Sequence, residues 1–216
     1  MLGVFGGTFD PVHIGHLRTA YELRAHLGLT EVRMVVSGSP PHRARPAAAA
    51  ADRWRMLELA LAGAPHCGLV ADRRELDRAG PSYMVDTLEE MRAEAGEMPI
   101  CLLLGTDAFA GLARWHRWTD IARLAHLVVV ARPGDGEVYD GPLRALWDRR
   151  TDDPTRLREV PAGRVLTVTL TQLDVSATRI RRQIADGLGA EFLTPAPVVR
   201  YIETRRLYLG LVECNG

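Results

Sequence analysis

The chain has 216 residues, of which 47% are hydrophobic and 25% are charged, and its 27 basic residues balance its 27 acidic ones. This length supports one sizeable core, while the lack of net charge disfavours nucleic acid and anionic membranes as partners. No apolar run approaches the ~20 residues that a membrane span requires, so we expect a globular, cytoplasmic protein.

Arginine supplies every basic residue, because the sequence contains no lysine. This excludes Schiff-base chemistry on lysine and the lysine-containing phosphate loop of P-loop proteins. The absence of lysine can reflect a codon bias toward arginine that has no functional meaning. The excluded mechanisms stay excluded whether or not the bias has a function. Three widely spaced cysteines (Cys67, Cys101 and Cys214) form no C-x-x-C pair, which fits a reducing compartment and no disulfide framework.

Short apolar runs alternate along the chain with segments whose apolar residues recur at helical spacing. The predicted strands are Leu2–Phe5, Val32–Val36, Ile100–Leu104, Leu127–Val130 and Val165–Leu170. The predicted helices are Ile14–Leu27, Asp52–Leu61, Tyr83–Met91, Thr119–Ala125, Ser176–Ala185 and Pro197–Leu209. Asp52 and Ser82 stand at expected N-cap positions. Continuously apolar strands that alternate with helices predict a doubly wound parallel sheet, whose ligands bind outside the carboxyl ends of the strands.

No internal repeat or composition boundary divides the chain, so we expect one domain over 1–216, with a helical portion from about 176 to 216 packed on it. The alanine tract after Pro46 is interpreted as a loop that leads into the helix at Asp52. The proline- and glycine-rich segment from Arg132 to Pro142 is interpreted as a surface loop.

The strongest local signal follows the first predicted strand, in Gly6-Gly7-Thr8-Phe9-Asp10-Pro11-Val12-His13-Ile14-Gly15-His16. Paired glycines allow the backbone to approach a ligand, and their amides together with the following helix N-terminus form an anion site. His13 and His16 are three residues apart and share one face of the first helical turn. Gly15 between them lacks the side chain that would block a ligand.

The sequence around His13 and His16 allows other interpretations of the two histidines. Zinc ligation needs a third or fourth ligand, and no nearby Cys or acidic cluster supplies one, so we expect no protein-held metal. Both histidines are also compatible with an ordinary polar helix start. A dinucleotide-cofactor fingerprint, G-x-G-x-x-G, is absent.

A second signal lies near the C-terminus, in Asp174-Val175-Ser176-Ala177-Thr178-Arg179-Ile180-Arg181-Arg182. Ser176 is a natural N-cap, Thr178 and the free amides of the first turn suit phosphate oxygens, and Arg181 adds a charged fork. The alternative is a solvated arginine-rich helix face.

Three weaker segments complete the pattern. Pro40-Pro41-His42-Arg43 follows a strand, and Gly80-Pro81-Ser82-Tyr83-Met84 leads into a helix whose amides suit a carboxylate. Gly105-Thr106-Asp107 ends a strand and precedes the aromatic cluster Trp115-His116-Arg117-Trp118, in which a tryptophan face can stack on a flat ring, although aromatic residues commonly pack in the core.

Taken in this order, these segments resemble the bacterial nicotinate-nucleotide adenylyltransferases of the nucleotidyltransferase superfamily. Gly6 to His16 is similar to the family's G-G-[ST]-F-[DN]-P-x-H-x-G-H signature, and Ser176 to Arg181 to its S-x-T-x-x-R signature. The resemblance extends from about Leu2 to Tyr208 and implies a Rossmann-like fold. It also implies transfer of AMP from ATP to nicotinate mononucleotide, which yields deamido-NAD and pyrophosphate, with Mg²⁺ carried by ATP.

The resemblance also implies roles for individual residues. The catalytic group comprises His13, His16, Arg181, His42 and Arg43. ATP contacts come from Gly6, Gly7, Thr8, Phe9, His13, Gly15, His16, Gly105, Asp107, Ser176, Thr178 and Arg181. Contacts to nicotinate mononucleotide come from Arg43, Tyr83, Met84, Trp115 and Asp107. Because lysine is absent, we expect all cationic help from the protein to come from arginine or protonated histidine.

The chain departs from the family pattern at four positions. Met84 stands where Thr is common, Val36-Ser37 where Pro-Asn is frequent, and Thr106 where an aromatic or small residue is frequent. The preference for the acid or the amide form of the mononucleotide therefore stays open. The sequence also leaves open whether the protein forms a homo-oligomer. The alternatives are another adenylyl- or cytidylyltransferase such as phosphopantetheine adenylyltransferase, an aminoacyl-tRNA synthetase fragment, which lacks its lysine loop here, and a non-catalytic pyridine-nucleotide sensor.

Overall fold

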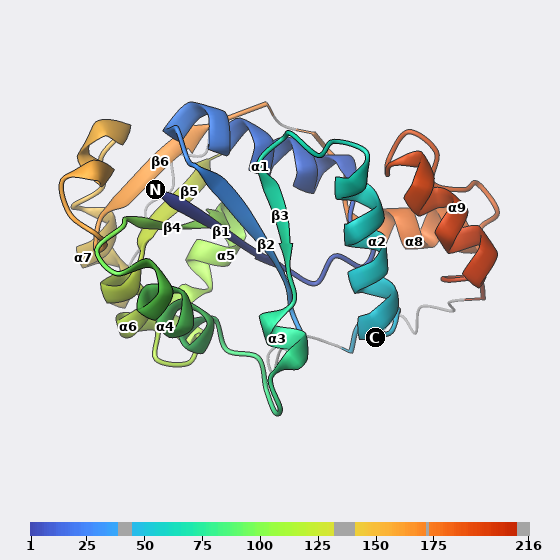
Figure 1. The fold of residues 1–216 in the computed structure, drawn as a ribbon, viewed down its shortest axis with the longest axis horizontal. Helices are drawn as coiled ribbons and strands as arrows, with labels where there is room; N and C mark the ends of the chain where they lie inside the picture. Colours follow the sequence, from blue (N-terminus) through green and yellow to red (C-terminus); the bar gives the residue numbers. More distant parts are fainter. Residues whose placement is uncertain (39–44, 132–140, 172, 211–216) are drawn as a thin grey trace.

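The structure is a computed structural model that describes residues 1–38, 45–131, 141–171 and 173–210. Within these residues, six strands form a single parallel sheet (Figure 1). They are β1 (Leu2–Gly7), β2 (Glu31–Val36), β3 (Leu69–Asp72), β4 (Ile100–Gly105), β5 (His126–Ala131) and β6 (Val165–Thr169). The predicted α/β fold with a doubly wound parallel sheet is confirmed.

The order of the strands is β3-β2-β1-β4-β5-β6. The chain builds the sheet outward from β1 through β2 to β3, then returns to the other side of β1 with β4. The direction of winding therefore reverses between β1 and β4. In parallel α/β sheets this reversal opens a crevice at the carboxyl ends of the two strands, where ligands bind.

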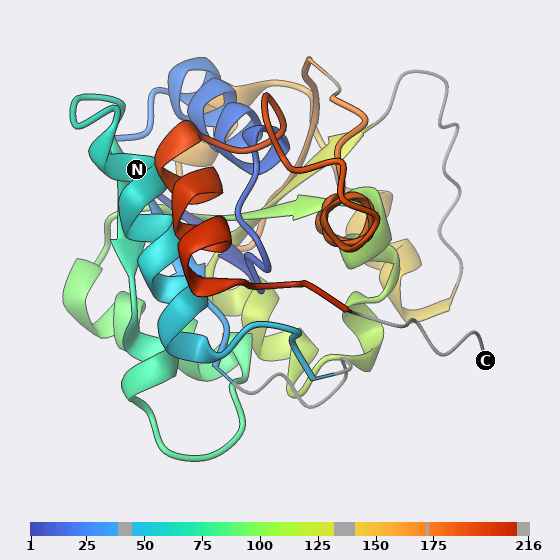
Figure 2. The ribbon, with the colours of Figure 1, turned by 90° about the vertical axis from the view of Figure 1, so that its right-hand side faces the viewer.

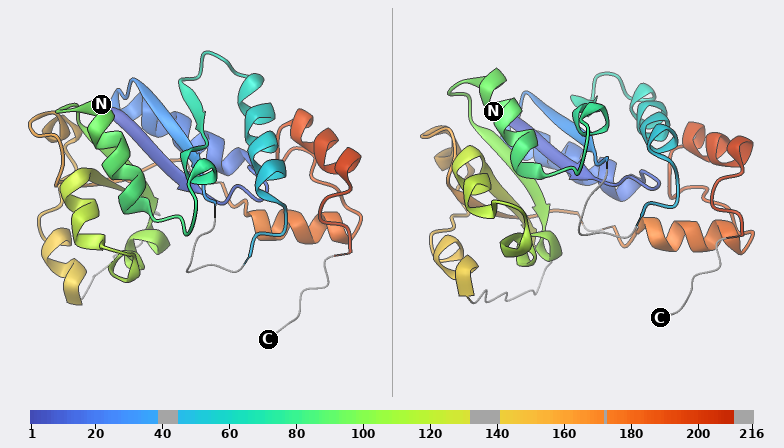
Figure 3. Two further views of the ribbon diagram at one scale, coloured as in Figure 1. Left: turned by 60° about the horizontal axis from the view of Figure 1, so that its bottom comes forward. Right: turned by 90° about the horizontal axis from the view of Figure 1, so that it is seen from below.

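Helices cover both faces of the sheet (Figures 1 and 3). One face packs against α1 (Ile14–Leu27), α2 (Ala50–Ala62), α8 (Ala177–Ala185) and α9 (Ala196–Arg205), and the other against α4 (Met84–Ala95), α5 (Thr106–Ala110), α6 (Trp118–Leu124) and α7 (Arg144–Trp147). Short α3 (Arg74–Asp77) and the 3₁₀ turns η1 (Leu112–Arg114), η2 (Gly141–Leu143) and η3 (Pro154–Arg158) lie in the connections.

The apolar strands are buried because alternate side chains enter two separate cores. On β4, Cys101 and Leu103 belong to the core under α1 and α8, whereas Leu102 and Leu104 belong to the core under α4 and α6. This two-sided burial is why the strand reads as a continuous apolar run. None of the helices in the described part of the chain is long and apolar enough to span a membrane.

The C-terminal helix α9 lies beside α2 (Figure 2). The Tyr201 hydroxyl on α9 donates a hydrogen bond of 2.8 Å to Oδ1 of Asp52 on α2. Beyond α9, the Tyr208 hydroxyl donates a hydrogen bond of 2.8 Å to Oδ1 of Asp10, and both side chains are buried. The last described residues therefore contact the loop that follows β1.

Some predicted details were wrong. Ala49 caps α2, so Asp52 lies in its first turn, and Tyr83 rather than Ser82 precedes α4. Ser82 instead accepts a hydrogen bond of 3.2 Å from the Gly38 amide. Strand β3 was not predicted at all, because it is short and three of its four residues are only partly buried, so no continuous apolar run announces it.

Candidate active site

Three helices begin at the edge of the sheet where the strands end. In each βα unit of a parallel sheet the helix starts at the carboxyl end of the strand, so α1, α4 and α8 direct their N-termini toward the same edge. Their free amides and the positive ends of their dipoles favour anions there. The two signature segments of the sequence, at α1 and α8, therefore meet at one end of the sheet.

The turn after β1 is held in shape by the Phe9 ring. Phe9 has a φ of 49° and is 1% exposed, and a Cβ on Gly7 would lie 2.8 Å from that ring. Glycine at position 7 thus lets the backbone pass over the ring. Because the Phe9 side chain is buried, any contact of this residue to a nucleotide would come from its backbone.

His13 and His16 hydrogen-bond reciprocally at the start of α1. The His16 amide donates to Nδ1 of His13 at 3.4 Å, and the His13 amide donates to Nδ1 of His16 at 3.3 Å. The two rings stack with their centroids 3.6 Å apart and their planes inclined by 22°. The histidines therefore cap the helix, as the plain helix-start interpretation supposed, and this capping uses only one nitrogen of each ring.

The hydrogen bonds determine which nitrogen of each neutral ring carries the proton. Since Nδ1 accepts a hydrogen bond, we assign the proton to Nε2. No residue in the described part of the chain hydrogen-bonds to either Nε2. The site thus has two N–H donors available for an oxyanion, on rings fixed by the helix cap.

Burial keeps these rings neutral. It lowers the pKa of His13 to about 4, and burial, followed by the neighbouring His13, holds the pKa of His16 well below its usual value. Removing an imidazolium from water is costly, which favours the uncharged form. At pH 7 neither His13 nor His16 therefore contributes a positive charge, whereas Arg181 does.

Gly15 lies against the His13 ring. A Cβ at position 15 would lie 3.0 Å from Nδ1 and 3.1 Å from Cε1 of His13. The sequence argument was that glycine keeps space for a ligand, which stays a prediction; in this structure the group that a Cβ at position 15 would meet is the stacked imidazole. Phe9 supports the second ring edge-on, at 5.1 Å between its centroid and that of His16.

Asp10 connects this turn to three other parts of the chain, and sequence reasoning did not single it out. Its carboxylate accepts hydrogen bonds from the amides of Ala47 (2.7 Å) and Ala48 (3.1 Å), which precede α2, and from Tyr208. Its carbonyl oxygen accepts a hydrogen bond of 2.8 Å from Nη1 of Arg181. Nothing local in the sequence signals these long-range contacts.

The second signature segment reaches the same turn through Arg181. Ser176 is the N-cap of α8, and its hydroxyl accepts a hydrogen bond of 3.2 Å from the Arg179 amide, as predicted. Arg181 is partly buried, and its Nη2 donates to the Thr178 hydroxyl at 3.3 Å. Two anchored contacts orient the guanidinium beside the β1–α1 turn while part of it faces solvent.

Two residues expected to bind the acceptor, Tyr83 and Met84, lie at the start of α4, which covers the opposite face of the sheet from α1. A Cβ on Gly6 would approach Cε of Met84 to 2.5 Å, so Gly6 brings the end of β1 close to the start of α4. The Tyr83 ring packs against His116 at 4.3 Å between centroids. The sequence analysis named His116 only within the aromatic cluster and gave it no role; its contact with Tyr83 places the Trp115 loop beside the α4 N-terminus.

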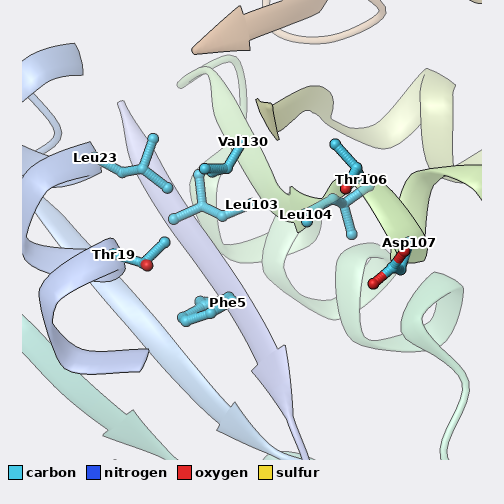
Figure 4. A pocket seen from close by; sticks show the side chains of 9 residues that line it. Phe5, Thr19, Leu23, Leu103, Leu104, Thr106, Asp107 and Val130 are labelled. Atoms are coloured by element: carbon cyan, nitrogen blue, oxygen red, sulfur yellow. The ribbon is translucent and has the colours of Figure 1, made fainter. Parts of the chain in front are cut away.

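A pocket of about 180 Å³ opens at the point where the winding reverses. Its described lining consists of Phe5, Thr19, Leu23, Leu103, Leu104, Gly105, Thr106, Asp107 and Val130. Apolar side chains form its walls, with Thr19 at one end and the Asp107 carboxylate at the other (Figure 4). Gly105 and Asp107 are both among the residues expected to contact nucleotide, whereas His42 and Arg43 lie outside the described residues.

Metal ligands are not gathered in this region. Among the described residues, no group of three or more His, Cys, Asp or Glu side chains is placed to hold a metal ion. The Asp10 carboxylate already accepts three hydrogen bonds. The donor set around the two histidines consists of N–H groups, which suit phosphate oxygens rather than a cation.

Arg53 is a further residue that the sequence analysis missed. It is 1% exposed on α2, and its guanidinium donates to backbone carbonyls near the ends of β1 and β2. Arginine on a helix ordinarily suggests a solvated side chain, so its position in the sequence carried no signal.

Comparison with known proteins agrees with this geometry. The cytidylyltransferase-like family matches residues 4–183. A protein of Methylococcus capsulatus named probable nicotinate-nucleotide adenylyltransferase is 47% identical over 209 residues, which cover 96% of this chain and 99% of the relative. A relative with the same name from Dechloromonas aromatica is 48% identical, with 96% and 97% covered.

Solved structures show the same fold. The nicotinic acid mononucleotide adenylyltransferase of Plasmodium falciparum, complexed with NaAD, superimposes with a TM-score of 0.71 at 13% identity, with 96% of each chain covered. A second structure of the Plasmodium falciparum nicotinic acid mononucleotide adenylyltransferase, complexed with APC, superimposes with a TM-score of 0.67 at 13% identity, with 96% of each chain covered. With the identity and coverage of its curated relatives, the chain belongs to the nicotinate-nucleotide adenylyltransferase family, within the cytidylyltransferase-like nucleotidyltransferases.

Proposed function

We propose that this protein transfers the AMP group of ATP to nicotinate mononucleotide, forming deamido-NAD and pyrophosphate in the synthesis of NAD. The observation that carries the proposal is the stacked pair His13 and His16 at the N-terminus of α1, in which the helix cap uses each Nδ1 and leaves each Nε2 without a partner among the described residues. Arg181 joins the same turn through the Asp10 carbonyl oxygen. We propose further that the chain acts in the cytoplasm as one nucleotidyltransferase domain.

The chemistry asks little of the protein beyond placement and charge stabilisation. A phosphate oxygen of the mononucleotide attacks the α-phosphorus of ATP, the bond from that phosphorus to the bridging oxygen breaks, and pyrophosphate leaves with the electron pair. The attacking phosphate has a second pKa near ~6 and is mostly dianionic at pH 7. No general base is needed, so the buried, neutral histidines are suited to the task.

In this proposal each group stabilises charge at a different point. His13 and His16 donate Nε2–H to the α-phosphate oxygens, where charge develops, and the amides of Gly6, Gly7 and Thr8 cradle the phosphates. Arg181 supplies the fixed cation for the leaving pyrophosphate, with Ser176 and Thr178 at the same helix start. Neutral donors stabilise the transition state without binding the ATP ground state as tightly as cations would.

In this proposal the acceptor, nicotinate mononucleotide, binds at the carboxyl ends of the strands, near the end of β2 and the start of α4. Tyr83 caps α4 without a side-chain hydrogen bond, so the first amides of α4, including that of Met84, can receive the nicotinate carboxylate. Because a backbone amide makes this contact, the departure at Met84 is tolerable. Trp115 stacks on the pyridine ring, Arg43 and His42 serve the phosphates, and Gly105 and Asp107 contact nucleotide.

Magnesium enters as a companion of ATP. The described residues around the histidines offer N–H donors and no carboxylate cage, so they do not fit a resident metal. Mg²⁺ bound to the phosphate oxygens of ATP would screen their charge.

The proposed reaction is tested by a coupled pyrophosphate assay with ATP and three acceptors in parallel: nicotinate mononucleotide, nicotinamide mononucleotide and phosphopantetheine. We expect the highest kcat/KM with nicotinate mononucleotide. Preference for the amide would correct the specificity alone, and preference for phosphopantetheine would overturn the proposed function. Binding of pyridine nucleotides without pyrophosphate release would instead indicate a sensor.

A further inference from the structure

The guanidinium of Arg53 joins the ends of two neighbouring strands. Its Nη1 donates to the carbonyl oxygens of Thr8 (2.8 Å) and Ser37 (2.7 Å), and its Nη2 donates to that of Gly38 at 3.3 Å. Thr8 directly follows β1, whereas Ser37 and Gly38 directly follow β2. One planar group thus fixes the separation of two loops that leave the sheet side by side.

The connection continues from Gly38 to α4. The Gly38 amide donates to the Ser82 hydroxyl at 3.2 Å, and Ser82 precedes Tyr83, the N-cap of α4. The approach is close, because a Cβ on Gly38 would lie 2.5 Å from the Glu75 carbonyl oxygen and 2.9 Å from Oγ of Ser82. A continuous set of hydrogen bonds therefore runs from the β1–α1 turn through Arg53 to the start of α4.

The environment of Arg53 indicates a specific geometric role. Burial lowers its pKa, an effect that the nearby Asp10 and Tyr208 partly offset. Nε is buried without a hydrogen-bond partner among the described atoms. A buried guanidinium with an unpaired nitrogen is an expensive way to stabilise a fold, whereas its planar fork holds three carbonyls at fixed separations, which a lysine ammonium cannot reproduce.

We propose that Arg53 is a positioning residue for adenylyl transfer: its guanidinium sets the spacing between the ATP-binding turn at Thr8 and the acceptor-binding start of α4, through Gly38 and Ser82. This inference rests on the proposed function, in which those two segments hold the two reactants. In-line attack depends on their separation, and a displacement near 1 Å can cost ~10²-fold in rate.

The test is Arg53→Lys, which keeps the charge but loses the planar fork. We expect kcat to fall by ~10- to 10²-fold, while the Kd values for ATP and for nicotinate mononucleotide, each measured alone by calorimetry, stay unchanged. A variant with wild-type kcat per folded molecule and only a lower Tm would overturn the proposal. So would a loss of activity explained entirely by weaker binding of one substrate.

Arg92→Lys is the matched control. Arg92 also donates to several backbone carbonyls, those of Gly96, Met98, Leu124 and Pro161, but at the opposite edge of the sheet, before β4 and β5 begin. The same substitution there should lower Tm and leave kcat and both Kd values unchanged. An equal fall of kcat in this control would show a general effect of lost stability and would refute the assignment.

Ser82→Ala tests the other end of the connection if Arg53→Lys fails to fold. It removes the hydroxyl that accepts the Gly38 amide, at a buried position just before α4, and we expect a smaller fall of kcat with both Kd values retained. Unchanged kcat in Ser82→Ala would overturn the proposal. If the wild-type protein transfers AMP to none of the acceptors, the proposed function itself has failed, and this outcome is distinct from an effect confined to the variants.

Discussion

The imidazoles of His13 and His16 lie stacked, with centroids 3.6 Å apart, and each Nδ1 accepts the backbone N–H of the other residue. One arrangement thereby satisfies two amides at the start of α1 and leaves both Nε2–H groups without a partner among the described residues. Helix capping and the proposed donation to phosphate use different nitrogens of the same rings, so substitutions can separate the two roles.

His13→Asn should retain the cap and lose the donor. Asparagine is a strong N-cap, so we expect the free energy of unfolding to change by less than about 1 kcal/mol, while turnover falls by at least ~10²-fold. His13→Ala should lose both, with a further ~1 kcal/mol of stability. Urea denaturation and the pyrophosphate assay measure the two effects, and full activity in His13→Asn would contradict the assigned role.

His16→Ala should lower pyrophosphate release by at least ~10²-fold, the scale of losing one placed electrostatic donor. Its effect on ATP binding should be small, because the donor acts on charge that develops in the transition state. Single-turnover kinetics with saturating substrates provide the measurement. Unchanged turnover would remove His16 from the catalytic group.

The pH dependence of stability follows from the lowered pKa values. An unfolded histidine titrates near ~6.5, whereas His13 titrates at about 4 in the folded protein. Between these values the unfolded chain binds more protons, so the free energy of unfolding falls as the pH is lowered, by up to about 1.4 kcal/mol per pH unit for each such histidine, and this loss is absent above ~6.5.

His13→Asn should show a shallower slope in the same window. His16 and His126, whose pKa values burial also lowers, contribute to the slope that remains. Long-range ¹H–¹⁵N spectra should show both active-site rings neutral at pH 6, with the proton on Nε2. Imidazolium signals from His13 at that pH would contradict the neutral assignment.

Gly15→Ala should reduce activity without unfolding the helix. The added Cβ lies 3.0 Å from Nδ1 of His13, so the ring must shift, while alanine inside a helix contributes ~0.5–1 kcal/mol relative to glycine. We expect a fall in kcat with little loss of stability. Gly63→Ala at the end of α2, where the nearest atom to a Cβ lies 3.8 Å away, is the control and should retain full activity.

Tyr208→Phe should destabilise the protein by ~1–3 kcal/mol, because it removes a hydrogen bond to the buried Asp10 carboxylate. Tyr201→Phe removes a bond of equal length to Asp52 from a partly exposed ring and should cost less. Urea denaturation of both variants makes the comparison. A larger effect at Tyr201 would mean that the Asp10 contact contributes little.

The fold was largely predictable, because strands buried on both faces leave apolar runs and intervening helices leave their spacing. β4 illustrates this, with Cys101 and Leu103 in one core and Leu102 and Leu104 in the other. β3 was not predictable in this way, since an edge strand of four residues is only partly buried. Asp52 and Ser82 have good capping side chains, but tertiary contacts with Tyr201 and Gly38 use them instead.

The candidate site likewise has features that the sequence revealed and features that it did not. The segments around His13 and Ser176 were visible because glycines, caps and histidines lie close together in sequence. The roles of Arg53, Asp10 and His116 were missed because their partners lie far away along the chain. The neutrality of His13 was also inaccessible, since it depends on how completely the fold buries the ring.

The bond between Tyr208 and Asp10 spans 198 positions of the chain, and translation proceeds from the N-terminus. While a ribosome is still making α9, Asp10 already exists but has no phenol to donate to it. The loop that carries His13 and His16 therefore reaches its full hydrogen bonding only after residue 208 has been made. The proposed ATP-binding turn thus acquires its last hydrogen bond late in the synthesis of each chain.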